Sequence, residues 1–194
     1  MAEKITLKRC LLFWIAPMSL LVLSAAPLGA EAQIYGLLGT GKADTDLDQV
    51  ELDFGNDFQV GGGFNWLGGE GFRAGLGVEV NYFTGSDQFE DIDLDIDSTI
   101  TSLNFVIESA GPIRPFVSAG VGLGHNDLSS RNTFDPEIRF DGEEFSFAYT
   151  VGGGLKAILG EVFLLGADFH YFRIQTDPEP IRLYRAAGIF GVKF

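Results

Sequence analysis

An acidic run in mid-chain is the first feature that could do chemistry. Residues 90–97 read Glu-Asp-Ile-Asp-Leu-Asp-Ile-Asp, five acids and three aliphatic residues in near-strict alternation. Carboxylates two residues apart on a strand lie about 6–7 Å apart, close enough to share a hard cation. Calcium, however, takes about six to eight oxygen ligands, and the run lacks the glycine and terminal glutamate of an EF-hand loop. We therefore predict no metal site and no cofactor, with a loose association of divalent ions as the alternative.

Two histidines could take part in catalysis or proton transfer. His125 is followed by Ser129 and Ser130, but nucleophilic catalysis needs serine and histidine within hydrogen-bond reach, and this spacing forms no recognisable motif. His170 and Asp168 would share one face of a strand, where the imidazole could titrate near neutral pH. We predict a structural role for His170, with a gated proton or ion path as the alternative, and no enzymatic activity.

The first 32 residues have the features of a secretory signal peptide. Lys4, Lys8 and Arg9 precede an apolar stretch that runs from residue 10 to residue 23, and the small-x-small triplet Ala30-Glu31-Ala32 follows. The apolar stretch is shorter than the roughly 20 residues that a spanning helix needs. We predict cleavage after Ala32, so that residues 1–32 are the signal peptide and residues 33–194 are the single mature domain. A retained N-terminal anchor is the alternative.

The expected mature chain is acidic and has no cysteine. Removing residues 1–32 lowers Lys+Arg from 13 to 10 and Asp+Glu from 27 to 25, so the formal charge becomes 10 − 25 = −15. Such a charge argues against non-specific binding to nucleic acid or to anionic phosphate surfaces. An exported domain without cysteine has no disulfide, so its stability must have another source.

The mature chain reads as eight strand-like segments. In residues 71–83, for example, Leu76, Val78 and Val80 alternate with Gly77 and Glu79. The phase of the first segment is ambiguous. The expected segments are 33–42, 53–66, 71–83, 98–108, 113–125, 144–157, 162–174 and 181–194.

The polar faces and the connections of these segments predict a closed barrel. The polar faces hold mostly Gly, Ser, Thr and Asn, the small residues that fit inside a narrow barrel. Tight turns at 67–70, 109–112 and 158–161 alternate with mostly longer, acidic connections at 43–52, 84–97, 126–143 and 175–180, a pattern typical of outer-membrane barrels. The predicted fold class is all-β: an eight-stranded antiparallel up-and-down transmembrane β-barrel. A soluble sandwich is the alternative.

Charged residues on the polar faces should point into the lumen. Buried charges persist only when they are paired, so we expect a structural ionic network there. The inward candidates are Arg73, Glu79, Lys156, Asp168, His170, Arg185 and Lys193.

Two segments resemble the small eight-stranded outer-membrane barrels, the group that contains OmpX, OmpW, the opacity proteins and the membrane domain of OmpA. They are Arg114-Pro115-Phe116-Val117-Ser118-Ala119-Gly120-Val121-Gly122 and the end of the chain from Ala186 to Phe194. The resemblance implies a bacterial outer-membrane location among lipid and lipopolysaccharide. It also implies that the barrel-assembly machinery reads the terminal residues Phe190, Val192 and Phe194.

The direction of the acidic run follows from parity. The predicted apolar face of 98–108 consists of odd-numbered residues, so Asp91, Asp93, Asp95 and Asp97 should leave the outer wall above the lipid if the strand continues. Ile92, Leu94, Ile96 and Ile100 would then point into the mouth and could line an entry for a hydrophobic compound, as the resemblance to OmpW-type barrels allows. A bulge near Ser98 would reverse this parity.

The expected function is structural or surface-binding: membrane integrity, or adhesion to an extracellular partner through the acidic outer connections. A narrow channel or transporter for a small hydrophobic or ionic solute is the second class. A lipid-modifying enzyme, which some similar barrels are, is the third.

Overall fold

The computed structural model describes residues 30–47, 50–89, 92–132, 139–176 and 180–194, all of which form strands or the short turns and ends between them. From Glu31 to Phe194 the chain forms one compact unit. Its eight strands are β1 (Glu31–Leu47), β2 (Val50–Gly68), β3 (Phe72–Phe89), β4 (Ile92–Ser109), β5 (Ile113–Asn132), β6 (Arg139–Leu159), β7 (Phe163–Gln175) and β8 (Ile181–Lys193). The described residues contain no helix that is long and apolar enough to cross a membrane.

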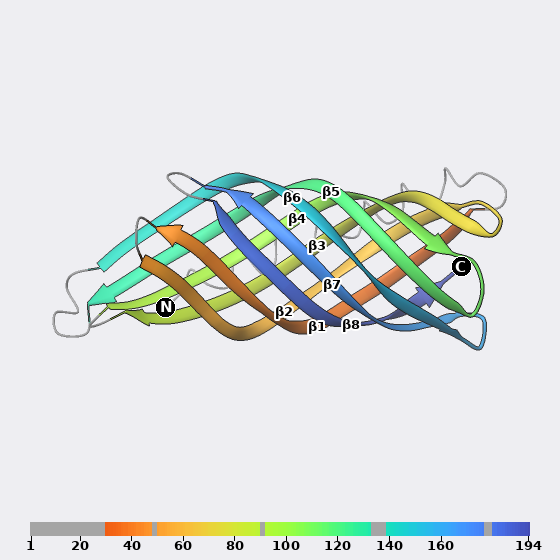
Figure 1. Cartoon of the computed structure of the whole chain (residues 1–194), viewed down its shortest axis with the longest axis horizontal. Helices are drawn as coiled ribbons and strands as arrows, with labels where there is room; N and C mark the ends of the chain where they lie inside the picture. The colour runs from red at the N-terminus through yellow and green to blue at the C-terminus, as the bar shows by residue number, and fades with distance from the viewer. Residues whose placement is uncertain (1–29, 48–49, 90–91, 133–138, 177–179) are drawn as a thin grey trace, which may run out of the picture. The chain divides into compact units, whose positions relative to one another are not determined.

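The sheet closes on itself. Each strand pairs antiparallel with the next one in sequence, and β8 returns to pair with β1 (Figure 1). The β1–β8 register runs from Gln33 opposite Lys193 to Asp44 opposite Arg182. Beyond it, the Phe194 amide donates to the Ala32 carbonyl at 2.8 Å, and the Ala32 amide donates to the Phe194 carbonyl at 3.3 Å. Closure leaves no strand edge with unpaired backbone groups along this seam.

Side chains alternate between the two sides of the wall along every strand. Large apolar residues such as Leu103, Phe105 and Phe169 are about half exposed on the outer side. Buried polar residues such as Asn104 and Ser118 lie on the inner side. The structure also fixes the phase of β1, which the sequence left open: odd-numbered residues such as Gln33 and Leu37 point inward.

The strands extend further than the sequence predicts, and the expectation of long outer connections is largely wrong. Residues 43–47, 84–89, 92–97, 126–132 and 139–143 belong to strands rather than to loops. Their polar and acidic composition resembles that of loops because no lipid faces this part of the wall, so its outward residues need not be apolar. The predicted connection at 175–180 does fall between β7 and β8.

The three tight turns lie at the opposite end of the barrel. They occupy residues 69–71, 110–112 and 160–162, as the sequence predicts. Gly69 and Gly111 adopt φ angles of 124° and 118°, which a residue with a side chain rarely adopts. The same end carries the paired chain segments at Ala32 and Phe194, so we call it the short-turn end.

Two apolar clusters fill parts of the lumen. The inner apolar cluster consists of Leu37, Leu67, Val106, Phe116, Ala187 and Ile189. The outer apolar cluster, further from the short-turn end, consists of Ala43, Phe83, Ile96, Ile100, Ala148, Phe172, Ile174 and Leu183. Along β8 the inward residues run from Lys193 through Ile189 to Arg185 and Leu183, so polar and apolar layers alternate along the lumen.

Candidate functional site

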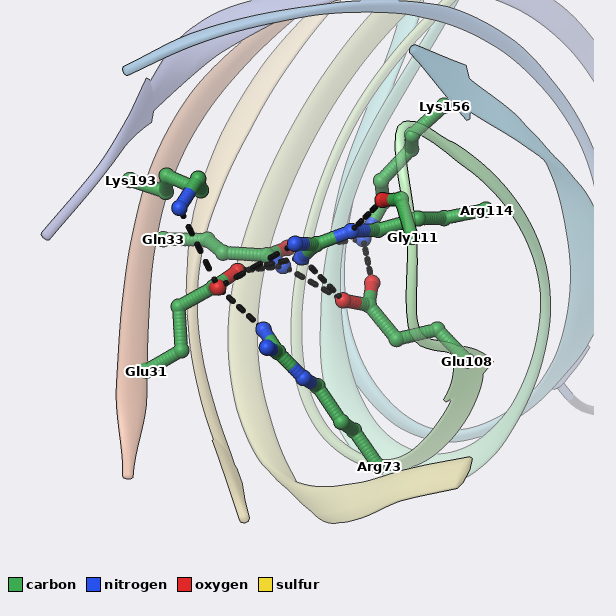
Figure 2. A network of polar contacts seen from close by, with 8 residues as sticks. All are labelled: Glu31, Gln33, Arg73, Glu108, Gly111, Arg114, Lys156 and Lys193. Carbon is green, nitrogen blue, oxygen red and sulfur yellow. Dashed lines mark hydrogen bonds and ion pairs between the residues drawn. The ribbon is translucent and has the colours of Figure 1, made fainter. Parts of the chain in front are cut away.

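The first polar layer lies at the short-turn end, and we call it the rim network. It joins side chains from six of the eight strands, which point toward one another across the lumen (Figure 2). Its members are Glu31 and Gln33 on β1, Arg73 on β3, Glu108 on β4, Arg114 on β5, Lys156 on β6 and Lys193 on β8.

Glu108 is the central acceptor of the rim network. Its carboxylate accepts hydrogen bonds from Lys156 Nζ at 3.0 Å, from Arg114 Nη1 at 3.0 Å and from Gln33 Nε2 at 2.8 Å. Gln33 Oε1 also accepts from Lys156 Nζ at 2.8 Å, which leaves that buried ammonium with two polar partners. The ammonium further lies 4.5 Å from the centre of the Phe116 ring, a favourable cation–π distance.

Glu31 is the second carboxylate of the rim network. It pairs with Arg73, with Arg114 Nη1 at 2.5 Å and with Lys193 Nζ at 3.6 Å. Arg114 is therefore clamped between two carboxylates, and its Nε also donates to the Gly111 carbonyl of the adjacent turn at 2.8 Å. Two carboxylates face four cationic side chains, so each carboxylate is needed to offset charge that the lumen wall shields from water.

The second polar layer lies between the two apolar clusters, and we call it the central network. Arg185 connects it: Nη1 donates to Glu79 at 3.0 Å, Nη2 donates to Asp168 at 2.5 Å, and the guanidinium also bonds Asn81. The Tyr35 hydroxyl donates a further hydrogen bond to the Glu79 carboxylate at 2.8 Å.

Ser118, His170 and Asp168 in the central network have the connectivity of a hydrolytic triad. Ser118 Oγ lies 2.9 Å from His170 Nε2, and His170 Nδ1 lies 2.6 Å from Asp168 Oδ2. A working triad also needs substrate to reach the nucleophile. The adjacent cavity has a volume of about 10 Å³, enough for about one water molecule, and Ser118 is only 7% exposed. The arrangement therefore fits a buried polar brace, and Arg185 shares the same Asp168 oxygen.

The structure brings all seven inward candidates into these two layers. Arg73, Lys156 and Lys193 join the rim network, while Glu79, Asp168, His170 and Arg185 join the central network. Sequence reasoning missed Glu31, Gln33, Tyr35, Glu108, Arg114 and Ser118 as members. Parity could have found Glu108, which shares its face with Ser102 and Asn104. Glu31 was assigned to the signal peptide, and the unresolved phase of the first segment hid Gln33 and Tyr35.

The acidic run lies on β4 at the outer end. Asp95 and Asp97 are exposed, whereas Ile96 and Ile100 are 2% and 0% exposed inside the barrel, the sides that parity assigned to them. The β3–β4 register passes from Tyr82 opposite Thr99 through Phe83 opposite Ser98 without a shift, so no bulge reverses the parity. Asp91, and the side chains of Ile92, Asp93 and Leu94, lie outside the described part of the structure. The buried isoleucines pack in the outer apolar cluster rather than lining an open entry.

His125 does not pair with the nearby serines in the part of the chain that the structure describes. Its ring stacks on Phe145 at 4.5 Å, and Nε2 lies 3.6 Å from Asp127 Oδ1. Its Nδ1 has no hydrogen-bond partner among the described residues, so no base for Ser129 is formed. The side chain of Ser130 lies outside the described residues. At the end of the chain, Phe190 and Phe194 are exposed on the outer wall and Val192 is half-buried, and their predicted role in assembly stays a prediction.

An apolar outer wall, a closed antiparallel sheet and a lumen filled with paired charges define a small transmembrane β-barrel. A family model described as "Outer membrane protein beta-barrel domain" matches residues 15–192. The chain belongs to this family, and the protein is located in the outer membrane of a Gram-negative bacterium. Residues 1–29 lie outside the described residues, so the signal peptide and its cleavage after Ala32 stay predictions.

Solved structures with the same fold include bacterial surface proteins and an enzyme. The attachment invasion locus protein Ail of Yersinia pestis is 15% identical over 86% of this chain and 100% of its own, with a TM-score of 0.56. Neisserial surface protein A is 15% identical over 84% of this chain and 99% of its own, with a TM-score of 0.58. The outer membrane enzyme PagL is 17% identical over 81% of this chain and 97% of its own, with a TM-score of 0.51. At these identities the likeness shows the fold alone. No curated protein matches the sequence.

Removing the central acceptor of the rim network should destabilise the barrel. We expect Glu108→Gln to lower the free energy of unfolding by about 3–5 kcal/mol, because the buried Lys156 and Arg114 would each lose a charged partner. Urea titration in lipid vesicles measures this. Glu70→Gln, an exposed turn residue, is the control and should change the value by less than about 0.5 kcal/mol. Equal stability of the two variants would contradict a structural role for the network.

The place of Glu31 in the rim network sets an expectation for export processing. Cleavage after Ala32 would remove the carboxylate that pairs with Arg73 and Arg114. The structure therefore leads us to replace the cleavage site that the sequence alone predicts, after Ala32, with one after Ala30 or earlier, so that the mature protein keeps Glu31. Intact-mass measurement of protein extracted from outer membranes tests this, and a mature N-terminus at Gln33 would show that the rim network forms without Glu31.

Proposed function

We propose that this protein is a sealed outer-membrane anchor with a structural and surface-binding role, and that it carries an acidic, strand-built platform outside the membrane. The observation that carries the proposal is the filled lumen. An eight-stranded barrel has room for side chains rather than for a broad water channel. Here four successive layers of buried side chains occupy that room.

The two apolar layers support sealing against ions. Phe172, Ile100 and Ile174 of the outer apolar cluster are each 0% exposed, and they come from β7 and β4, which are not neighbours in the closed sheet. An ion that entered the lumen would lose its hydration shell among hydrocarbon side chains. The two polar layers offer it little in exchange, because the charged groups in them already pair with each other.

The outer ends of the strands support a surface-binding role. Strands β2 to β6 have 18 to 21 residues, whereas β7 and β8 have 13 each. About ten residues of tilted strand span a bilayer, so β2 to β6 continue well above it. Six of the fourteen residues from 84 to 97 are acidic, and none is basic. Charge complementarity favours a basic partner at such a surface.

Catalysis does not enter the proposal. The Ser118, His170 and Asp168 side chains are buried next to a cavity of about 10 Å³, which is too small for an ester or peptide substrate. The likeness to PagL extends to the fold and carries no residue roles.

Planar-bilayer recording tests whether the lumen is sealed. We expect the purified barrel to give no steady current above that of the lipid alone, because the layers of buried side chains leave no continuous aqueous path. A wide-pored outer-membrane barrel inserted by the same procedure is the positive control. A reproducible unitary conductance from this protein would overturn the sealed-anchor part of the proposal and favour solute passage.

Adhesion of cells tests the acidic platform. Asp95→Asn/Asp127→Asn removes two charges at the outer end, and Glu70→Gln/Glu161→Gln removes two exposed charges from the opposite, periplasmic turns. In cells with truncated lipopolysaccharide, we expect only the outer pair to lower retention on poly-lysine-coated surfaces, since only that pair faces outward. Equal retention of both variants and the parent would argue against an electrostatic surface role.

A further inference from the structure

The cationic side chains of the barrel are distributed unevenly. The structure describes the side chains of eight Lys and Arg residues, and five of them, Arg73, Arg114, Lys156, Arg185 and Lys193, point into the lumen. The other three, Lys42, Arg173 and Arg182, lie at outward positions on β1, β7 and β8. These strands are neighbours in the closed sheet, so all three outward cations share one wall. We call it the cationic wall.

The register places these cations beside a row of aromatic rings. Arg173 lies opposite Arg182, Tyr171 lies opposite Tyr184, and Lys42 lies opposite Tyr184 on the other side of β8. The Tyr171 and Tyr184 ring centres are 5.2 Å apart. Both arginines are two residues further toward the outer end than the tyrosines, a distance of about 6–7 Å along a strand. Outward tyrosines of a barrel lie at the membrane interface, so the arginines reach the level of the lipid headgroups.

The opposite wall has the opposite charge. Among the strand residues whose side chains the structure describes, the outward acidic ones are Asp95, Asp97 and Asp127. All three lie on β4 or β5. Asp97 and Asp127 face each other across these strands. In the closed order, β4 lies across the barrel from β8, and β5 lies across from β1. Among the side chains that the structure describes, the outward cations therefore lie on one side of the outer end and the outward acids lie on the other, while the β1–β8 register places Asp44 opposite Arg182.

We propose that the cationic wall binds the phosphate groups of lipopolysaccharide in the outer leaflet. The wall lies at the end away from the short periplasmic turns, where lipopolysaccharide is the phosphate-bearing lipid that surrounds the barrel. Arg173 lies directly opposite Arg182, a position in which like charges destabilise a sheet. On the other side of β8, Asp44 lies opposite Arg182, and a phosphate would supply a counter-charge beside Arg173. The planar guanidinium group also matches the geometry of phosphate oxygens.

The site does not require its cations to be otherwise without partners. Lys42 and Arg182 each take part in another interaction. A guanidinium has five N–H donors, so Arg182 can keep its present partner and still donate to a phosphate. Arg173 is exposed on the same wall. This lipid site goes beyond the proposed surface role, because it would hold the barrel in the leaflet whatever the acidic platform binds.

Native mass spectrometry of the barrel in detergent tests the site with three added lipids: lipid A, dephosphorylated lipid A and phosphatidylglycerol. We expect lipid A to bind, and dephosphorylated lipid A to bind at least about tenfold more weakly, because it lacks the groups that the arginines contact. Inorganic phosphate at millimolar concentration should not displace lipid A. Equal binding of lipid A and dephosphorylated lipid A, or equal binding of lipid A and phosphatidylglycerol, would overturn the proposal.

Matched variants place the binding on the cationic wall. Arg173→Gln/Arg182→Gln should weaken binding of lipid A by about tenfold or more. Asp95→Asn/Asp127→Asn on the opposite wall should leave it unchanged or strengthen it. The heat-dependent shift in electrophoretic mobility verifies that each variant is folded. If the arginine variant does not fold, Arg173→Gln alone and the comparison of lipids on the unaltered protein decide the question. A folded arginine variant with unchanged affinity would refute the proposal.

Discussion

The pairing of β1 with β8 removes the two free edges that an eight-stranded sheet would otherwise expose to hydrocarbon. Closure of so few strands makes a narrow lumen, and this narrowness determines the composition of the inner face. Gly152 illustrates the limit, because a Cβ atom at that position would overlap the imidazole ring of His170. Small residues are therefore interspersed with the large charged ones, and each large side chain lies against strands that offer it space.

The same closed wall accounts for the layering of the lumen. Charged groups enclosed by a barrel lose most of their hydration, so they remain charged only where they meet counter-charges and hydrogen-bond partners. The rim and central networks meet that demand with side chains contributed by strands far apart in sequence, such as Glu31 with Arg114 and Glu79 with Arg185. Aliphatic and aromatic residues occupy the lengths between them. Contacts of this kind join opposite walls and resist flattening of the barrel.

Much of this fold could be predicted from sequence, because alternation, small inward residues and glycine-rich turns are local signals. The inward direction of Asp168, His170 and Arg185 followed from parity alone. Which partner each would choose could not be predicted, since the pairing of Arg185 with Glu79 depends on the stagger of β3 against β8, strands that are not neighbours in the sheet. The rim position of Glu31 conflicted with a strong small-x-small cleavage signal. The long strand extensions were missed because their outer face meets water, so apolar residues no longer mark them as strands.

The central claim is that the wall of this barrel separates lipid outside from a filled lumen inside. Nitroxide labels at single cysteines introduced at residues 101–107 of β4, in a Cys10→Ser background, test it most directly. We expect oxygen, which concentrates in lipid, to reach labels at Leu103, Phe105 and Ile107, and a water-soluble nickel complex to reach no label at Ser102, Asn104 or Val106. Loss of the two-residue alternation, or access of the nickel complex to the even-numbered positions, would contradict the account.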